Sequence, residues 1–227
     1  MKKTVSTSIL LSSLSLAAMV PSTAMAVEGL SANVGATSNY LWRGVSQTDD
    51  GAAISGGIDY EDASGFYAGT WASNIDFGDD ASYELDLYLG YAWEVGDFTY
   101  DVGYIYYAYP DSAEVDSSNE YDFGEIYGSI GYGAFSLSAF YGVNNDDGAG
   151  FADKSLYLSG DAEFEIAPDL TLGLHLGSYN FDDDSSEDYI DFAASLSKDG
   201  FTFTVADTDL SHDDLKVVVS YSVDFDL

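Results

Sequence analysis

The sequence has no cysteine, only three prolines and only six basic residues among 227, against 40 acidic ones. Without cysteine, neither a disulfide framework nor a thiolate metal site can form. The shortage of Lys and Arg excludes the basic surface that nucleic-acid binding requires. After the first 26 residues, charges or turn residues interrupt every apolar stretch well before the ~20 residues that a membrane-spanning helix needs.

The first 26 residues have the composition of a cleaved secretory signal peptide. Lys2 and Lys3 form a positive start, residues 9–20 are apolar apart from serines, and Ala24-Met25-Ala26 offers a small-residue cleavage site. We therefore expect export and a mature chain of residues 27–227. Its four basic residues against 40 carboxylates would give a net charge of about −36, which repels nucleic acid and attracts cations, or simply keeps the surface hydrated.

The chain is rich in tyrosine (19) and glycine (23), and about twelve short segments are apolar at every second residue. The alternation is clearest in residues 83–95, 156–166, 170–176 and 215–227. In the first of these, Leu85, Leu87 and Leu89 alternate with polar positions such as Glu84 and Asp86. A helix would scatter these carboxylates around its circumference, so the pattern indicates strands with one apolar and one wet face.

Two kinds of connection alternate between the segments. Tight turns are expected at residues 62–65, 95–97, 132–134, 167–169 and 198–200, and acidic loops at 42–51, 76–82, 110–122, 144–153, 182–188 and 209–214. Short periplasmic turns and long extracellular loops are typical of outer-membrane barrels. The sequence therefore predicts an all-β, transmembrane antiparallel β-barrel of about twelve strands.

The remaining predicted strands have mixed faces, so their register stays open. They are residues 29–37, 52–62, 66–76, 98–109, 123–132, 135–143, 189–198 and 201–208. The last strand alternates apolar and polar residues up to Leu227, with Val218 as the one misfit. This strand is similar to the C-terminal signal that the outer-membrane barrel-assembly machinery recognises.

The most distinctive local string is Ser38-Asn39-Tyr40-Leu41-Trp42-Arg43-Gly44-Val45-Ser46. Its Tyr40, Trp42, Arg43, Gly44 and Ser46 resemble the Tyr-x-Trp-Arg-Gly-x-Ser element near the N-terminus of TorF-type porins. The glycine-rich segments 54–60 and 65–74 resemble the continuation of that family. The resemblance implies a porin-type barrel and no particular solute.

Arg43 is one of only four basic residues after the signal peptide. Two arrangements are open for it. It could fold from the first loop into the lumen and be clamped to acidic wall residues, where it would narrow or tune the pore, because a buried guanidinium needs carboxylate partners. Alternatively, it could form an external ion pair that only holds the loop down.

The wet face supplies the other candidate pore-lining residues. They are Glu84, Asp86, Asp101, Asp161, Glu163, Glu165 and His175. A ring of carboxylates in a constriction would favour cations and exclude anions, but any wet barrel also needs a polar interior. His175 is expected in the lumen because it shares the parity of Thr171 and Tyr179, opposite the leucine stripe.

We expect neither an enzyme nor a cofactor. A twelve-stranded outer-membrane phospholipase would need a histidine facing lipid, whereas His175 faces the lumen and His212 lies in an acidic loop. There is no Gly-x-Ser-x-Gly element. The acidic clusters at 79–80, 146–147, 182–184 and 213–214 lack the spacing of a calcium loop and indicate only weak cation binding.

The sequence thus predicts an outer-membrane, porin-like channel for passive diffusion of small hydrophilic solutes, with a preference for cations. The channel would be narrow, because barrels of about eight strands are filled by side chains and those of about 16 to 18 hold open channels. Expected partners are outer-membrane lipid, solutes or cations, and the barrel-assembly machinery. The alternatives are a non-conducting structural or surface-binding barrel and a secreted soluble β-sandwich.

Overall fold

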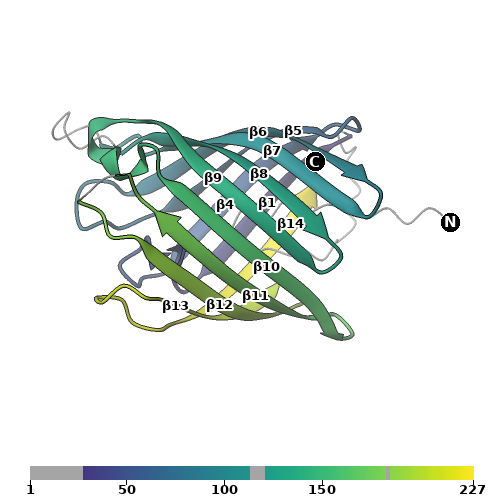
Figure 1. Cartoon of the computed structure of the whole chain (residues 1–227). Helices are drawn as coiled ribbons and strands as arrows, with labels where there is room; N and C mark the ends of the chain where they lie inside the picture. The colour runs from purple at the N-terminus through teal and green to yellow at the C-terminus, as the bar shows by residue number, and fades with distance from the viewer. Residues whose placement is uncertain (1–27, 113–120, 183–184) are drawn as a thin grey trace.

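The chain folds into one closed antiparallel barrel (Figure 1). The computed structural model describes residues 28–112, 121–182 and 185–227. Each strand pairs with its neighbours along the chain, and the first pairs with the last, from Ser31 opposite Asp226 to Thr37 opposite Ser220. The predicted twelve-stranded antiparallel barrel is confirmed, and the β-sandwich is wrong.

The barrel strands are β1 (Leu30–Thr37), β4 (Ala53–Glu61), β5 (Phe66–Asn74), β6 (Tyr83–Val95), β7 (Phe98–Ala108), β8 (Phe123–Tyr132), β9 (Phe135–Asn145), β10 (Leu156–Ala167), β11 (Leu170–Asn180), β12 (Tyr189–Lys198), β13 (Phe201–Thr208) and β14 (Lys216–Asp226). Most predicted ends fall within about two residues of these bounds. Two very short strands, β2 (Leu41–Trp42) and β3 (Val45–Ser46), form a separate hairpin, and one loop contains the 3-10 helix η2 (Asp147–Ala152).

The two ends of the barrel differ in the length of their connections. The five predicted tight turns all join strands at one end, here called the turn end, and the longer connections lie at the loop end. Asp169 and Asp199 have φ of 59° and 53°, the left-handed conformation that two-residue hairpins favour. The predicted signal peptide (1–26) lies outside the described residues, as does part of the predicted loop 110–122. Within the described residues, no helix is long and apolar enough to cross a membrane.

The outer face of the barrel carries the predicted apolar stripes. Leu87, Leu89, Leu174 and Leu176 all point outward and are 44–58% exposed. Aromatic rings pair side by side near the turn end, with centroids 5.3 Å apart for Trp93–Tyr100, 4.8 Å for Phe98–Tyr132 and 4.6 Å for Phe201–Tyr221. An apolar belt with such an aromatic girdle is the exterior of a membrane barrel.

The interior is filled unequally around its circumference. The inward residues of β5 to β9 include large aromatic side chains, such as Tyr67, Tyr107, Phe123 and Tyr127, which form the main buried cluster. On β12 to β14, β1 and β4 the inward residues are mostly small, and Val218, the misfit of the last strand, faces inward among them. The open space in the barrel therefore lies against the small-residue wall.

Glycines on neighbouring strands make room for the inward tyrosines. A Cβ atom at Gly90 would overlap the Tyr67 hydroxyl and lie 2.7 Å from the carbonyl oxygen of Val102. In the same way, a Cβ atom at Gly177 would overlap the hydroxyl of Tyr157. The mixture of Tyr and Gly that obscured the faces of the weaker strands is thus a packing requirement of the interior.

Gly90→Ala should lower the free energy of unfolding by about 1–3 kcal/mol, because the new methyl group has no space between a buried tyrosine and a backbone carbonyl. Gly128→Ala is the matched control, since its Cβ would find its nearest atoms at an ordinary 3.7 Å. Urea titration of refolded protein measures both variants. Equal stabilities for the two would contradict this packing role.

Candidate functional site: the luminal hairpin and the cavity beneath it

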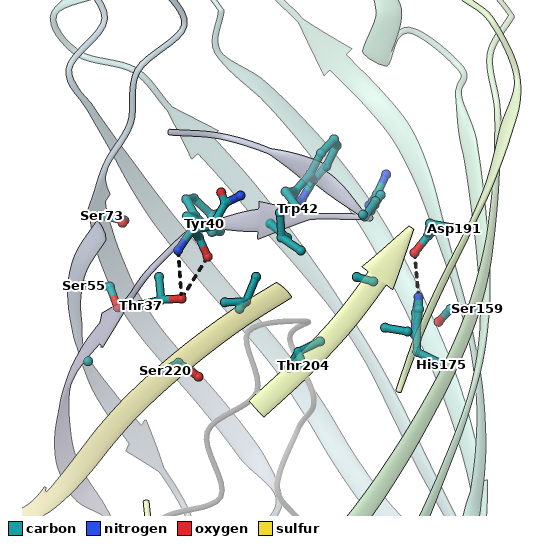
Figure 2. A pocket seen from close by; sticks show the side chains of 18 of the residues that line it. Thr37, Tyr40, Trp42, Ser55, Ser73, Ser159, His175, Asp191, Thr204 and Ser220 are labelled. Carbon is teal, nitrogen blue, oxygen red and sulfur yellow. Dashed lines mark hydrogen bonds and ion pairs between the residues drawn. The ribbon is translucent and has the colours of Figure 1, made fainter. Parts of the chain in front are cut away.

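Residues 39–48, here called the luminal hairpin, leave the end of β1 and fold into the barrel rather than away from it. Within the hairpin, Leu41 pairs with Ser46 and Trp42 with Val45. Arg43 and Gly44, the two turn residues, have φ of 49° and 83°, as a type I′ turn requires. Figure 2 shows the hairpin lying across the lumen, with Tyr40 and Trp42 above a cavity.

Arg43 is held at the tip of the luminal hairpin by Glu125 of β8. Its Nη1 and Nη2 atoms donate to the two carboxylate oxygens of Glu125 at 2.9 and 2.6 Å. Arg43 is 4% exposed and Glu125 is fully buried. The guanidinium carbon also lies 4.2 Å from the ring centroid of Trp42, 4.3 Å from that of Tyr157 and 4.6 Å from that of Tyr179. A bidentate ion pair enclosed by aromatic faces compensates the buried charge.

Other hairpin residues contact further strands. The Tyr40 hydroxyl donates to Glu84 of β6 at 2.6 Å, and the second carboxylate oxygen of Glu84 accepts from Tyr109 at 2.6 Å. Gly44 packs so closely on the opposite wall that a Cβ would lie 2.7 Å from side-chain atoms of both Asp191 and Thr208. The hairpin thus contacts β6, β8, β12 and β13 and occupies the lumen toward its loop end.

Hydrogen bonds fix the base of the luminal hairpin. Ser46 Oγ donates to Asn39 Oδ1 at 2.7 Å and accepts from the backbone N–H of Asp50 at 2.9 Å. Asp50 in turn accepts from Asn39 and forms an ion pair with Lys216 of β14 at 2.9 Å. All five residues of the Tyr-x-Trp-Arg-Gly-x-Ser motif therefore shape the hairpin or anchor it.

A cavity of about 210 Å³ lies beneath the hairpin, on the small-residue side of the lumen. Hydroxyl groups surround it, and Figure 2 shows those of Thr37, Ser55, Ser73, Ser159, Thr204 and Ser220. Ser138 and Ser222 also line it. Trp71, Phe140 and Tyr157 lie on its aromatic side.

One charged group on the cavity wall is His175, which lies between two carboxylates. Its Nδ1 is 2.6 Å from Asp161 and its Nε2 is 2.8 Å from Asp191, while the Tyr157 hydroxyl donates to both oxygens of Asp191. Because ionised carboxylates only accept hydrogen bonds, both ring nitrogens must donate. The imidazole is therefore doubly protonated and positively charged. Among the described residues, no group of three or more His, Asp or Glu side chains is arranged to hold a metal ion.

The structure corrects the predicted position of the first loop. Residues 42–51 were expected outside the barrel, but Trp42, Arg43 and Gly44 lie inside it, because Arg43 finds its carboxylate there and Trp42 packs on Phe123 and other rings. Of the two arrangements open for Arg43, the structure has the side chain in the lumen, paired with Glu125 of the wall, and not in an external ion pair. Its role in narrowing or tuning the pore stays a prediction.

The other candidate residues lie on the inner face without forming a ring. Glu84, Asp86 and Asp101 are buried among tyrosines on the β6–β7 wall, and the Tyr67 hydroxyl donates to Asp101 at 2.8 Å. Asp161 and His175 lie together on the neighbouring strands β10 and β11. Glu163 and Glu165 follow Asp161 toward the turn end and are exposed.

Sequence reasoning missed Glu125 and Asp191. Both lie in predicted strands whose faces were left unassigned, since several of these strands carry tyrosine and glycine on both parities. The usable signal was charge balance. A buried Arg43 requires a partner, and Glu125 is the only acidic residue of β8.

Comparison with known proteins places the chain in a family. A family model described as "Bacterial protein of unknown function (Gcw_chp)" matches residues 22–223. The chain belongs to the Gcw_chp family. No curated protein matches this Gcw_chp chain significantly by sequence. The TorF-type resemblance of its hairpin motif stays a prediction.

Solved structures share the barrel of this Gcw_chp protein. The KdgM porin matches with a TM-score of 0.54 and 15% identity, over 87% of this chain and 99% of KdgM. A structure of the KdgM porin in complex with disordered oligogalacturonate matches with a TM-score of 0.54 and 12% identity, over 87% and 98% of the two chains. At these identities the likeness concerns the fold, which is that of a porin-type barrel.

Arg43→Ala should lower the free energy of unfolding by about 3–5 kcal/mol, because it leaves the buried Glu125 carboxylate without a positive charge, with only the Tyr107 hydroxyl as a hydrogen-bond donor. The double variant Arg43→Met with Glu125→Met should regain most of the loss, since it removes both charges and keeps side-chain volume. Lys216→Ala, which breaks the more exposed pair with Asp50, should cost at most about 1 kcal/mol. Urea titration measures all three. A double variant as unstable as Arg43→Ala would show that the hairpin is not held by this ion pair.

Proposed function

We propose that this chain is an outer-membrane, porin-like channel for passive diffusion of small hydrophilic solutes. The apolar belt and aromatic girdle on its outer face suit lipid, and the hydroxyl groups around the cavity in its lumen suit hydrated solutes. The fold shared with KdgM supports the same assignment. In this proposal the signal peptide directs export, and the barrel-assembly machinery inserts the chain.

The observation that carries the mechanism is the luminal hairpin across the barrel. It narrows the twelve-stranded lumen, because it lies across the loop end and contacts β6, β8, β12 and β13. The ion pair of Arg43 with Glu125 holds the hairpin in this position. Passive diffusion past it requires no covalent chemistry. We therefore propose a channel of small conductance and no enzymatic activity.

Luminal charge supports a preference for cations. Both positive groups at the cavity are compensated, Arg43 by Glu125 and His175 by two carboxylates. Farther toward the turn end, Glu163 and Glu165 are exposed and have no basic partner among the described residues. Oligogalacturonate, present in one KdgM structure, is an acidic saccharide. The described part of this lumen offers such an anion no uncompensated cation, so we propose that oligogalacturonate is not a solute here.

The second candidate is a non-conducting outer-membrane barrel with a structural or surface-binding role. The observation that favours it is again the luminal hairpin, which together with the aromatic cluster of β5–β9 fills much of the loop end. In this alternative the hairpin is a permanent plug.

Leu174→Arg should prevent or strongly weaken folding into lipid vesicles, because a charge on the lipid face near the bilayer centre costs about 2–4 kcal/mol. Thr171→Arg on the inner face of the same strand is the control and should fold nearly as well as the parent chain. The folded fraction is measured by urea titration in vesicles. Similar folding of both variants would contradict contact between the leucine stripe and lipid.

Planar-bilayer recording in a salt gradient tests conduction and charge preference together. We expect a small conductance with a reversal potential of cationic sign. The double variant Arg43→Ala with Glu125→Ala should raise conductance at least twofold, because the hairpin loses the ion pair that holds it, whereas Lys216→Ala should leave it nearly unchanged. Absence of current from verified folded protein would favour the non-conducting barrel, and an anionic reversal potential would refute the cation preference.

A further inference from the structure

We infer that the cavity beneath the luminal hairpin is a binding site for an uncharged, polyhydroxylated molecule of about monosaccharide size. If the bound molecule is also the transported solute, this inference rests on the proposed channel function. Binding in the cavity by itself does not require conduction.

Free hydroxyl groups are the first observation. Of the hydroxyls around the cavity, those of Ser55, Ser138, Thr204, Ser220 and Ser222 hydrogen-bond to no other described residue. They project from β4, β9, β13 and β14, so they surround the space from several directions. Each can both donate and accept, which matches a ligand whose own groups are hydroxyls.

The charges at the cavity point to an uncharged ligand. The Arg43 guanidinium is already paired with both oxygens of Glu125 and enclosed by aromatic rings, so an anion meets no uncompensated positive charge at this wall of the cavity. Asp161 and Asp191 are bonded to His175. A cation would have to compete with the His175 ring and with the Ser159 and Tyr157 hydroxyls, which bond to the second oxygens of Asp161 and Asp191, whereas a neutral hydroxyl can use the free hydroxyl groups without breaking an ion pair.

The cavity also has an aromatic side and a suitable size. Trp71 and Phe140 are partly exposed within the lumen and offer apolar faces to the same cavity. At about 210 Å³ the cavity greatly exceeds the roughly 10–15 Å³ that one water needs, and it is smaller than the roughly 300–1,000 Å³ of sites for drug-sized ligands. A sugar ring has both kinds of surface, with hydroxyl groups at its edge and C–H groups on its faces.

Intrinsic tryptophan fluorescence provides a direct binding test on the full mature chain, refolded in detergent micelles. Trp42 and Trp71 line the cavity, while Trp93 faces outward, so Trp93→Phe removes the background signal. Glucose, gluconate and glucosamine serve as neutral, anionic and cationic probes of similar size. We expect a saturable change with glucose, and at least tenfold weaker responses to gluconate and glucosamine.

The triple variant Ser55→Ala, Thr204→Val and Ser220→Ala removes free hydroxyls from three strands while keeping the cavity open. It should weaken glucose binding at least tenfold. Thr171→Val removes an inward hydroxyl of β11 that does not line the cavity, and it should bind as the parent chain does. Heat-modifiable gel mobility and circular dichroism verify that each variant is folded.

Several results would overturn the inference. The first is that folded protein gives no saturable response to glucose. The second is that gluconate or glucosamine binds as tightly as glucose, and the third is that the triple variant binds glucose as well as the parent chain does. Bilayer recording keeps the two proposals apart. Saturable glucose binding without any current would refute the channel and retain the site, whereas current without glucose binding would refute the site and retain the channel.

Discussion

Closure of the sheet is the constraint on which the rest of this structure depends. Pairing of β1 with β14 leaves no open edge, so the backbone polar groups of the strands are satisfied within the sheet. Closure also divides every strand into an outer and an inner face. The outer face can then be uniformly apolar, and all polar chemistry is forced into one narrow interior.

That interior must compensate its own charges, because few basic residues are available. On the β5–β9 wall, tyrosine hydroxyls stabilise the buried carboxylates by hydrogen bonds. Tyr40 and Tyr109 donate to Glu84, and Tyr67 donates to Asp101. Each tyrosine needs space over a neighbouring strand, and glycine supplies that space. The abundance of Tyr and Gly and the scarcity of Lys and Arg are therefore linked consequences of an acidic lumen.

The sequence predicted the barrel well because strand alternation and turn chemistry are local properties. Residues 83–95 and all five tight turns were placed within about one or two residues of their observed bounds. The luminal hairpin was not predicted as such, since nothing local shows that a loop folds inward. Its direction depends on Glu125, 82 residues further along the chain, and on aromatic rings from β7, β8 and β11. Charge balance raised the possibility of a buried Arg43, but only the closed barrel identifies its partner.

The early position of the luminal hairpin in the chain has a consequence for the order of assembly. Arg43 leaves the ribosome long before Glu125, and the wall against which Gly44 packs comes from β12 and β13, still later in the sequence. The hairpin can dock only when those strands are already in place around it. Its seating is therefore a late step in biogenesis that marks the finished barrel, and a chain that stalls with an incomplete wall carries an exposed, unpaired arginine.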